Sequence, residues 1–520
     1  MSPINYLLRT EPKKGKRSMT DKNEIATRRD FIQAGIGVAA AVAAPNWASA
    51  AISAPLASAP APSQKMIGIQ ISAISFVDEG VNKVLDILQE QGQVNALFLS
   101  TFTYDGGTGG RQVKSRPLPD HGKQEYDHFH GGNFATPHAQ FYTDTVFKDT
   151  KAPDHGNLDI LEAVLPETKK RGIKVYAWNY NIFRTDTPHV EELEEVDHEG
   201  NRRATCCAYN PNYRNFVLGL TRDHCTSYDI DGVMWGAEQQ GPLNNLIGAN
   251  TWPSPATCFC QFHRQAAKDR GIDVDRAIAG YKRLGQFIAQ SQAGHRPTDG
   301  YFVQFWRIMV DYPEILAWEK LWNDGKNSTY KGIYDTAKSV RPELQVGFHI
   351  WHTNSFSPFF RAEQDFERYS HYADFIKPVL YNNCAGPRYA TFIDHVQKTI
   401  FQDAPKEQVF SLHNEFLNYG DLSLASISTS GLSADYVLRE TKRSLEGVKG
   451  QCKIYPGIDI DIPTNKGEKE TSPEDVHAAT LAALKAGAEG VVFSRKYSEM
   501  RLANLSGGGA AVREFNLQKG

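Results

Sequence analysis

The chain has 520 residues, of which 41% are hydrophobic and 22% are charged, and its formal net charge is −3 at pH 7. This is an ordinary globular composition. Its mild acidity excludes the basic surface that nucleic acids or an anionic membrane would require. We therefore expect a small or neutral partner and no nucleic acid.

The first 50 residues have the features of an export signal. Paired arginines, Arg28 and Arg29, precede a short apolar run at 34–44 and small residues at 48–50. This order is typical of a twin-arginine signal peptide, and the apolar run is too short to span a bilayer. Residues 51–64, rich in Ala, Pro and Ser, are expected to form a flexible spacer. We predict a periplasmic or secreted protein whose mature chain carries a formal charge near −7 and has no membrane span.

From residue 65 onward, short apolar segments alternate with helical patterns. The expected strands are 66–74, 94–102, 173–183, 232–235, 344–351, 375–381, 453–460 and 490–497. Helical spacing of apolar residues falls at 80–91, 158–171, 212–227, 275–291, 301–322, 434–446 and 473–486. Strands that alternate with helices indicate a parallel sheet. Eight such strands predict an α/β fold, a (β/α)8 TIM barrel over residues 65–515.

Two stretches are longer than simple connections. Residues 105–156 and 241–342 are predicted to be long insertions, which are usually functional. Residues 409–416 could form a ninth strand, although we assign them to the connection after the sixth. An open, doubly wound sheet is the alternative fold, but no Gly-rich phosphate loop follows the first strand.

Carboxylates follow two of the expected strands. Glu238 comes after the strand 232–235, while Asp459 and Asp461 lie at the end of 453–460. Barrel enzymes place their catalytic groups where strands end, and two opposed carboxylates are the minimal equipment of a glycosidase. We predict Glu238 as the general acid/base and Asp459 as the opposing carboxylate, with Asp461 as the fallback. Alternatively, the aspartates cap a turn or pair with nearby basic residues.

Polar and aromatic residues occupy most of the other strand ends. Aromatic faces could contact sugar C–H groups or simply close the core, and His349 could be a buried core histidine. The basic pair at 495–496 could bind an acidic sugar or tune a carboxylate. The predicted substrate-binding residues are Trp235, Asn179, His349, Trp351, Tyr381, Asn382, Arg495, Lys496 and Tyr497.

Seven cysteines, an odd number, are spread over residues 206–452. The pair Cys258 and Cys260 is too closely spaced for a standard zinc knuckle, so we favour a structural disulfide or buried thiols. The histidines of the first insertion, His121, His128, His130 and His138, have no metal-binding spacing and are expected on a loop or lid. We predict no metal and no cofactor.

Four segments resemble an uncharacterised bacterial group of (β/α)8-barrel glycoside hydrolases with twin-arginine leaders. They are DGVMWGAEQQGPL (231–243), CFC (258–260), YPGIDIDIP (455–463) and GVVFSRKYSEMRLANL (490–505). The resemblance covers most of the mature chain and implies a barrel that acts on carbohydrate. In better-known barrel glycosidases an Asn commonly precedes a catalytic Glu on the fourth strand, whereas Ala237 stands here.

Two other functions remain compatible with the sequence. A catalytically silent carbohydrate-binding barrel would keep the aromatic residues without needing two carboxylates. A metal-dependent hydrolase could use His349, His352 and Asp459, but the first strand lacks the His-x-His pair that many barrel metallohydrolases carry.

Overall fold

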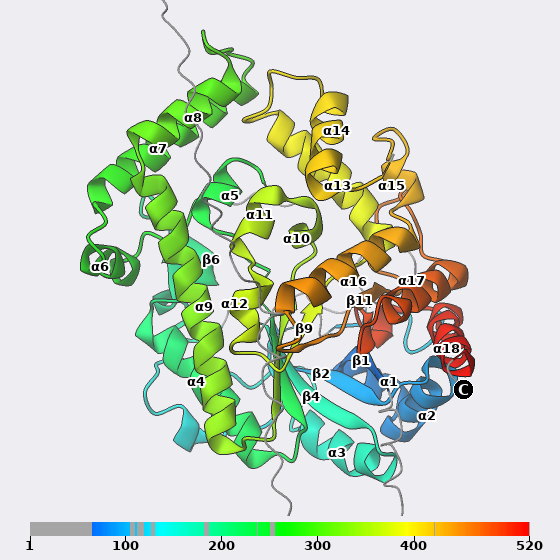
Figure 1. The fold of residues 1–520 in the computed structure, drawn as a ribbon. Coiled ribbons are helices and arrows are strands. Elements are labelled where there is room, and N and C mark those ends of the chain that lie inside the picture. Colours follow the sequence, from blue (N-terminus) through cyan, green and yellow to red (C-terminus); the bar gives the residue numbers. More distant parts are fainter. Residues whose placement is uncertain are drawn as a thin grey trace, which may run out of the picture. The chain divides into compact units, whose positions relative to one another are not determined.

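Parallel strands lie at the centre of the described part of the chain (Figure 1). The computed structural model describes residues 65–103, 110–111, 119–125, 130–180, 187–236, 238–249, 255–420 and 422–518. The predicted signal peptide and spacer therefore lie outside the described residues. The strands of the ring are β1 (Met66–Ser72), β2 (Ala96–Thr103), β4 (Lys174–Tyr180), β7 (Gly232–Gly236), β8 (Gln345–Ile350), β9 (Phe375–Pro378), β10 (Lys453–Ile454), β11 (Gly457–Asp459) and β12 (Gly490–Ser494).

The ring closes through a seventh strand that is interrupted in its middle. β10 pairs in parallel with β9, and β11 pairs in parallel with β12. Between them, Tyr455 donates its backbone N–H to Ile376 at 2.9 Å, and Pro456 accepts one from Val492 at 2.9 Å. β12 also pairs with β1, which pairs with β2. The order around the ring is β1-β2-β4-β7-β8-β9-β10/β11-β12, so the predicted (β/α)8 barrel is confirmed.

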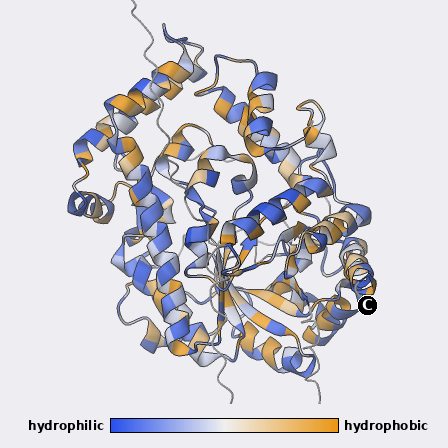
Figure 2. Cartoon of the chain, in the orientation of Figure 1, coloured by the Kyte–Doolittle hydropathy of each residue, from blue (hydrophilic) through white to orange (hydrophobic). Residues whose placement is uncertain are grey.

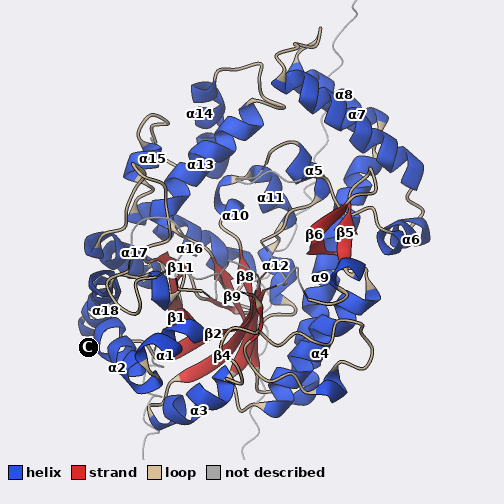
Figure 3. Ribbon diagram, turned by 180° about the vertical axis from the view of Figure 1, so that it is seen from behind, coloured by secondary structure: helices blue, strands red, loops and turns tan. Residues whose placement is uncertain are grey.

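Helices surround the strands on their outer side, as two opposite views show (Figures 1 and 3). The surrounding helices are α2 (Val81–Gly92), α3 (Ile160–Lys170), α4 (Pro211–Ser227), α9 (Glu314–Val340), α12 (Phe366–Ser370), α16 (Ala434–Val448), α17 (Pro473–Lys485) and α18 (Leu502–Leu517). Most of these helices contact their neighbours around the ring, with the largest contact between α17 and α18, because consecutive β/α units lie side by side.

The remaining elements belong to the connections between strands and helices. Among them, β3 (Gly132–Asn133) pairs antiparallel with β2, and β5 (Glu194–Val196) forms a hairpin with β6 (Arg202–Cys206). The others are α1 (Ala73–Glu79), α5 (Pro242–Leu246), α6 (Gln261–Asp269), α7 (Val274–Gln292), α8 (Tyr301–Asp311), α10 (Thr353–Phe356), α11 (Pro358–Glu363), α13 (Asn382–Gln397), α14 (Lys406–Leu417), α15 (Ile427–Ser430), and the short helices η1 (Ala139–Phe141), η2 (Val190–Glu192) and η3 (Tyr497–Glu499).

Residues 409–416 lie in α14, within the connection after the sixth strand to which they were assigned, and do not form a ninth strand. One detail of the predicted elements is wrong. The predicted helix 301–322 is two helices, α8 and α9, separated at Tyr312 and Pro313. Proline disfavours a helical conformation of the residue before it, and Tyr312 accordingly has φ −128° and ψ 67°.

Hydropathy follows this arrangement, with the strands largely hydrophobic and hydrophilic residues spread over the surrounding helices (Figure 2). This distribution is expected when strands of a parallel barrel are buried on both faces. Among the described residues, no helix combines the length and the apolar character needed to cross a membrane.

Aromatic rings fill the end of the barrel where the strands begin. The ring of Phe98 stacks on Tyr176 with centroids 4.9 Å apart, and Phe375 meets both rings edge-on. Glycines make room for them: a Cβ at Gly68 would lie 2.5 Å from Phe98, and one at Gly347 would lie 2.1 Å from Phe375. This end is therefore a tightly packed apolar core, which leaves the opposite end for polar side chains.

Because Gly347 has no space for a methyl group, we expect Gly347→Ala to destabilise the fold by about 1–3 kcal/mol through overpacking. Gly420→Ala is the matched control, since no atom lies within 4 Å of a Cβ at that position. It should change stability by no more than about 0.5 kcal/mol. Urea unfolding of both variants measures the difference. Equal midpoints would show that the ring of Phe375 can move aside without cost.

Candidate active site at the barrel mouth

Beyond the aromatic layer, three polar side chains meet inside the barrel. Gln70, His349 and Lys377 each lie two residues after an interior position of the aromatic layer, on β1, β8 and β9. Side chains two residues apart on a strand share a face, so all three are directed into the barrel. They form the floor of its C-terminal mouth.

Lys377 is the centre of this group. Its Nζ donates to Oε1 of Gln70 at 2.8 Å and to the hydroxyl of Tyr381 at 2.9 Å, and it lies 3.4 Å from Nδ1 of His349. An ammonium group has three hydrogens to donate, and each meets one of these acceptors. Burial lowers the pKa of Lys377 well below its usual value, while the negative charge of Glu238 opposes that shift.

His349 connects Lys377 to Glu238. Its Nε2 lies 3.3 Å from Oε1 of Glu238. A protonated Lys377 can only donate to Nδ1, so the proton of a neutral His349 stays on Nε2 and faces the carboxylate. Burial and the charge of Lys377 lower the pKa of His349 to about 4, which keeps the ring neutral at physiological pH.

Glu238 lies just beyond β7 and its side chain is 29% exposed. Burial raises the pKa of this carboxyl, but contact with His349 and the positive charges of Arg388 and Arg495 lower it by more. The net pKa is below its ordinary value, so Glu238 is ionised at neutral pH. This direction is the opposite of what a general acid requires.

Asp459, at the end of β11, is fully buried. Its Oδ2 accepts the backbone N–H of Cys384 at 2.9 Å, and its Oδ1 accepts that of Ile462 at 3.0 Å and the Thr471 hydroxyl at 3.3 Å. Burial raises the pKa of Asp459 to about 6, although the two backbone hydrogen bonds lower it. Asp459 thus holds a proton more readily than Glu238.

Asp461 does not share the environment of Asp459. Its oxygens accept from the guanidinium and backbone N–H of Arg501 and from Nδ2 of Asn504. Asp461 has φ 54°, a left-handed backbone conformation, so its side chain does not continue the extended strand that positions Asp459. Asp461, the alternative second carboxylate, is therefore held by an ion pair with Arg501 at 2.6 Å.

Most of the predicted substrate-binding side chains are buried against protein. Trp235 follows the inward-facing Met234 on β7, so it faces the surrounding helices and packs in the main core. Asn179 accepts a hydrogen bond from Thr101 at 2.8 Å. Trp351 meets the rings of His352 and Phe360 edge-on.

The remaining predicted residues divide between the mouth and its supports. Tyr381 accepts from Lys377 and therefore belongs to the polar floor, whereas Asn382 donates to Leu432. Arg495, whose side chain is 24% exposed, pairs with Glu499. Buried Lys496 donates to the carbonyl of Gly110, and the Tyr497 ring lies 4.3 Å from that of His121.

Three residues of the site were missed in the sequence. Gln70 and Lys377 are polar residues inside apolar strand segments, which is a signal for an inward-facing functional side chain. Arg388, on α13, is part-buried and acts on Glu238 through its charge. No strand end points to Arg388, because it lies within a helix.

The metal site proposed from sequence as an alternative does not form. Among the described residues, the two clusters of potential metal ligands contain none of His349, His352 and Asp459. Nδ1 of His349 faces Lys377, and Nδ1 of His352 lies 3.4 Å from Arg388. Likewise, all seven cysteines have free thiols, as buried thiols were expected to have, and no structural disulfide is present.

No family model matches the sequence, and no curated protein matches it. Solved structures match in fold. α-L-Fucosidase isoenzyme 2 from Paenibacillus thiaminolyticus is 12% identical, with a TM-score of 0.47 over 88% of this chain and 50% of that one. A β-galactosidase from Halorubrum lacusprofundi is 12% identical, with a TM-score of 0.48 over 87% of this chain and 58% of that one. A chitinase from Chromobacterium violaceum is 9% identical, with a TM-score of 0.38 over 87% and 99%.

The chain thus spans about half the length of the fucosidase and little more of the galactosidase. At such identities the likeness concerns the barrel fold alone. The chemistry of the mouth has to be argued from the residues of this chain.

The segment that follows Glu238 is fixed by two buried carboxyl groups. Glu319 on α9 accepts the backbone N–H of Leu243 at 2.7 Å, and Glu363 on α11 accepts from Asn244 at 2.7 Å. Burial and the neighbouring Glu363 raise the pKa of Glu319 well above its usual value, and burial also raises the pKa of Glu363. The pair therefore retains a proton that two exposed carboxyls would lose.

A carboxyl whose pKa is raised by folding stabilises the folded state at low pH, and this contribution disappears as pH rises through the folded-state pKa. Glu319→Gln cannot ionise but keeps an oxygen for Leu243. We therefore expect the unfolding free energy of the wild type to fall more steeply than that of the variant as pH rises above the ordinary range of a carboxyl group. Glu415→Gln, at an exposed position, serves as control. Parallel pH dependences for wild type and Glu319→Gln would contradict the argument.

Proposed function

We propose that the protein hydrolyses glycosidic bonds at the mouth of the barrel and that Glu238 is the carboxylate that reacts with the sugar. The observation that carries this proposal is the state of Glu238. It lies at the C-terminal edge of the barrel, is partly open to solvent, and is held ionised by a neutral histidine and two arginines. Barrel enzymes place reacting groups at this edge.

The second carboxyl in this proposal is Asp459, with its role exchanged relative to the sequence prediction. Glycosidases need one carboxylate and one carboxylic acid, and the pKa of about 6 makes Asp459 the better proton carrier. Glu238 either attacks the anomeric carbon or activates a water that does so. The bond to the leaving oxygen breaks, and that oxygen takes the proton of Asp459. Because Asp459 is fully buried, the substrate reaches its proton only after neighbouring side chains move.

Arg388 and Arg495 define the electrostatic character of the mouth. Both lower the pKa of Glu238, and both are part-buried. Arg495 already binds Glu499 in a bidentate geometry, so the two arginines act on the mouth through their positive charge, which favours anionic groups. We therefore include sugars with a carboxyl group among the substrates of the proposed reaction.

Glu238→Gln should reduce turnover at least about 100-fold on any glycan that the wild type cleaves, because the amide can neither attack nor accept a proton. A glycan panel identifies the substrate, and Glu415→Gln, at an exposed position of α14, is the matched control.

Asp459→Asn should remove the alkaline limb of the wild-type pH profile, which is expected near pH 6. It should lose less activity on aryl glycosides, whose leaving groups need no proton.

The outcomes separate the proposed enzyme from the alternatives. Equal activity of Glu238→Gln and wild type would place the reaction elsewhere. Binding of a glycan by both proteins without any product would support the catalytically silent barrel. Full activity of Asp459→Asn would show that another group supplies the proton.

We also propose that the protein is exported through the twin-arginine pathway to the periplasm or medium. Only the sequence supports this, because Arg28 and Arg29 lie outside the described residues. Replacing both with lysine should retain the precursor in the cytoplasm, while Arg9→Lys with Arg17→Lys should leave export unchanged. Cell fractionation with detection of the mature chain measures both, and unchanged export of the first variant would refute the proposal.

A further inference from the structure

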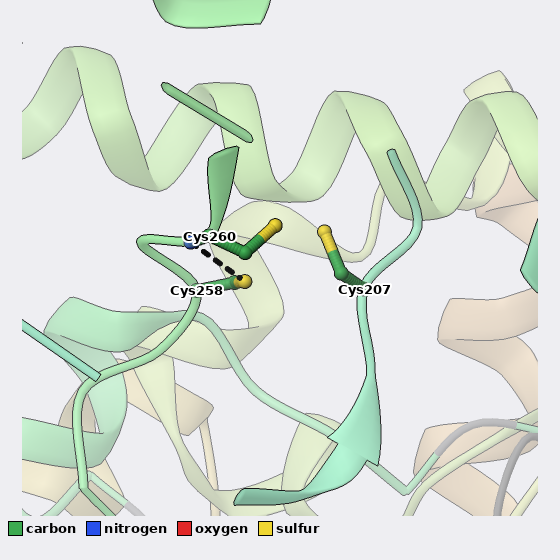
Figure 4. Close-up of side chains that lie close together, drawn as sticks. All are labelled: Cys207, Cys258 and Cys260. Atoms are coloured by element: carbon green, nitrogen blue, oxygen red, sulfur yellow. Dashed lines mark hydrogen bonds between the residues drawn. The ribbon is translucent and has the colours of Figure 1, made fainter. Parts of the chain in front are cut away.

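Three cysteines from distant parts of the sequence gather in one buried cluster. Cys207 follows β6, and Cys258 and Cys260 precede α6. Their sulfur atoms all lie within 4.8 Å of one another. Figure 4 shows the side chains directed toward a common small volume between the two segments. All three thiols are free.

His263 supplies a fourth donor atom beside this cluster. It lies in the first turn of α6, and its Nδ1 is 3.9 Å from the sulfur of Cys207. The ring is 1% exposed and is fixed by stacking on Trp318, with Tyr209 edge-on to it. The orientation of the imidazole toward the sulfurs is therefore built into the packing.

Three sulfurs and one imidazole nitrogen are a common ligand set of structural zinc sites. Zinc–sulfur bonds of about 2.3 Å and zinc–nitrogen bonds of about 2.0 Å place tetrahedral ligand atoms about 3.5–3.8 Å apart. The three sulfurs lie within 4.8 Å of one another, and Nδ1 of His263 lies 3.9 Å from the sulfur of Cys207. Side-chain rotations that bring the four atoms closer together would complete the geometry. Thiolates also select soft metals over Mg²⁺ or Ca²⁺.

The surroundings stabilise negative charge on sulfur. The backbone N–H groups of Val196 and Cys260 both donate to the sulfur of Cys258, each at 3.4 Å. Cys260 is the residue that precedes the first turn of α6, where the helix dipole favours an anion. Hydrogen bonds of this kind orient metal ligands and adjust their basicity.

We propose that Cys207, Cys258, Cys260 and His263 bind one Zn²⁺ ion in a closed tetrahedral site. Binding converts the three thiols to thiolates and releases their protons. With four protein ligands, no position is left for a reacting water, so the ion has a structural role. It ties the end of the β5–β6 hairpin to the start of α6. This site is separate from the residues of the proposed glycosidase reaction.

The test is metal analysis of the protein purified without chelator from zinc-supplemented medium. We expect about one equivalent of zinc in the wild type, and loss of that zinc in Cys207→Ala, Cys260→Ala and His263→Ala. Cys225→Ala is the matched control, because Cys225 is an equally buried thiol outside the cluster. It should retain the full equivalent.

A second measurement does not depend on the folding of the variants. Co²⁺ taken up by the zinc-depleted wild type should give sulfur-to-cobalt charge-transfer absorption and the intense visible bands of a tetrahedral ion. Wild type that binds neither zinc nor cobalt would overturn the proposal. So would an intact mass that is two hydrogens lighter, with the disulfide mapped to two of these cysteines. Retention of zinc by Cys207→Ala and Cys260→Ala would place the ion elsewhere.

Discussion

The buried amino group of Lys377 determines the arrangement of the barrel mouth. A charged lysine inside a protein is costly unless its hydrogens are all accepted and its charge is balanced. Lys377 meets the first condition through Gln70, Tyr381 and His349, which come from three parts of the barrel. Glu238 meets the second, because its negative charge supports the ammonium. The part-exposed carboxylate of Glu238 thus also balances the charge of Lys377 inside the barrel.

This coupling explains the protonation states along the mouth. Burial and the charge of Lys377 lower the pKa of His349, so the histidine stays neutral beside Glu238. Glu238 in turn is kept ionised although burial acts against it. A substrate that neutralised Glu238 would remove the negative charge that raises the pKa of Lys377. Protonation inside the barrel would then depend on substrate binding at its mouth.

The barrel itself could be predicted from the sequence because buried parallel strands leave a strong local signal. Each of the eight predicted segments contains a strand of the barrel, although 66–74, 375–381 and 490–497 extend past the end of it. The seventh is interrupted at Tyr455 and Pro456. The site was harder, since its contacts depend on the direction of each side chain. Trp235 was assigned to the mouth, but the alternation of β7 turns it toward the helices. Asp461 was grouped with Asp459, but its left-handed backbone turns it toward Arg501.

The cysteine cluster could not be predicted from the sequence either, because its members are far apart along the chain. The short spacing of Cys258 and Cys260 argued against a metal, because the missing ligand lies far away along the chain. Only the β5–β6 hairpin brings Cys207 to this pair, and only the first turn of α6 adds His263. The odd number of cysteines needs no unpaired thiol from a broken disulfide to explain it, because three of the thiols bind one ion in the proposed site.

The proposed ion and the proposed reacting group are connected through the segment between them. His263 lines a small cavity together with Glu195 and Gln239, and Gln239 is the neighbour of Glu238 in the chain. A zinc ion that fixes His263 would therefore limit the movement of the cavity lining that includes Gln239. Under the proposed twin-arginine export, the folded protein would acquire this ion before it reaches an oxidising compartment, where two of the three adjacent thiols would otherwise form a disulfide. The metal would protect the thiols, and the thiols would hold in place the lining of the cavity that includes Gln239.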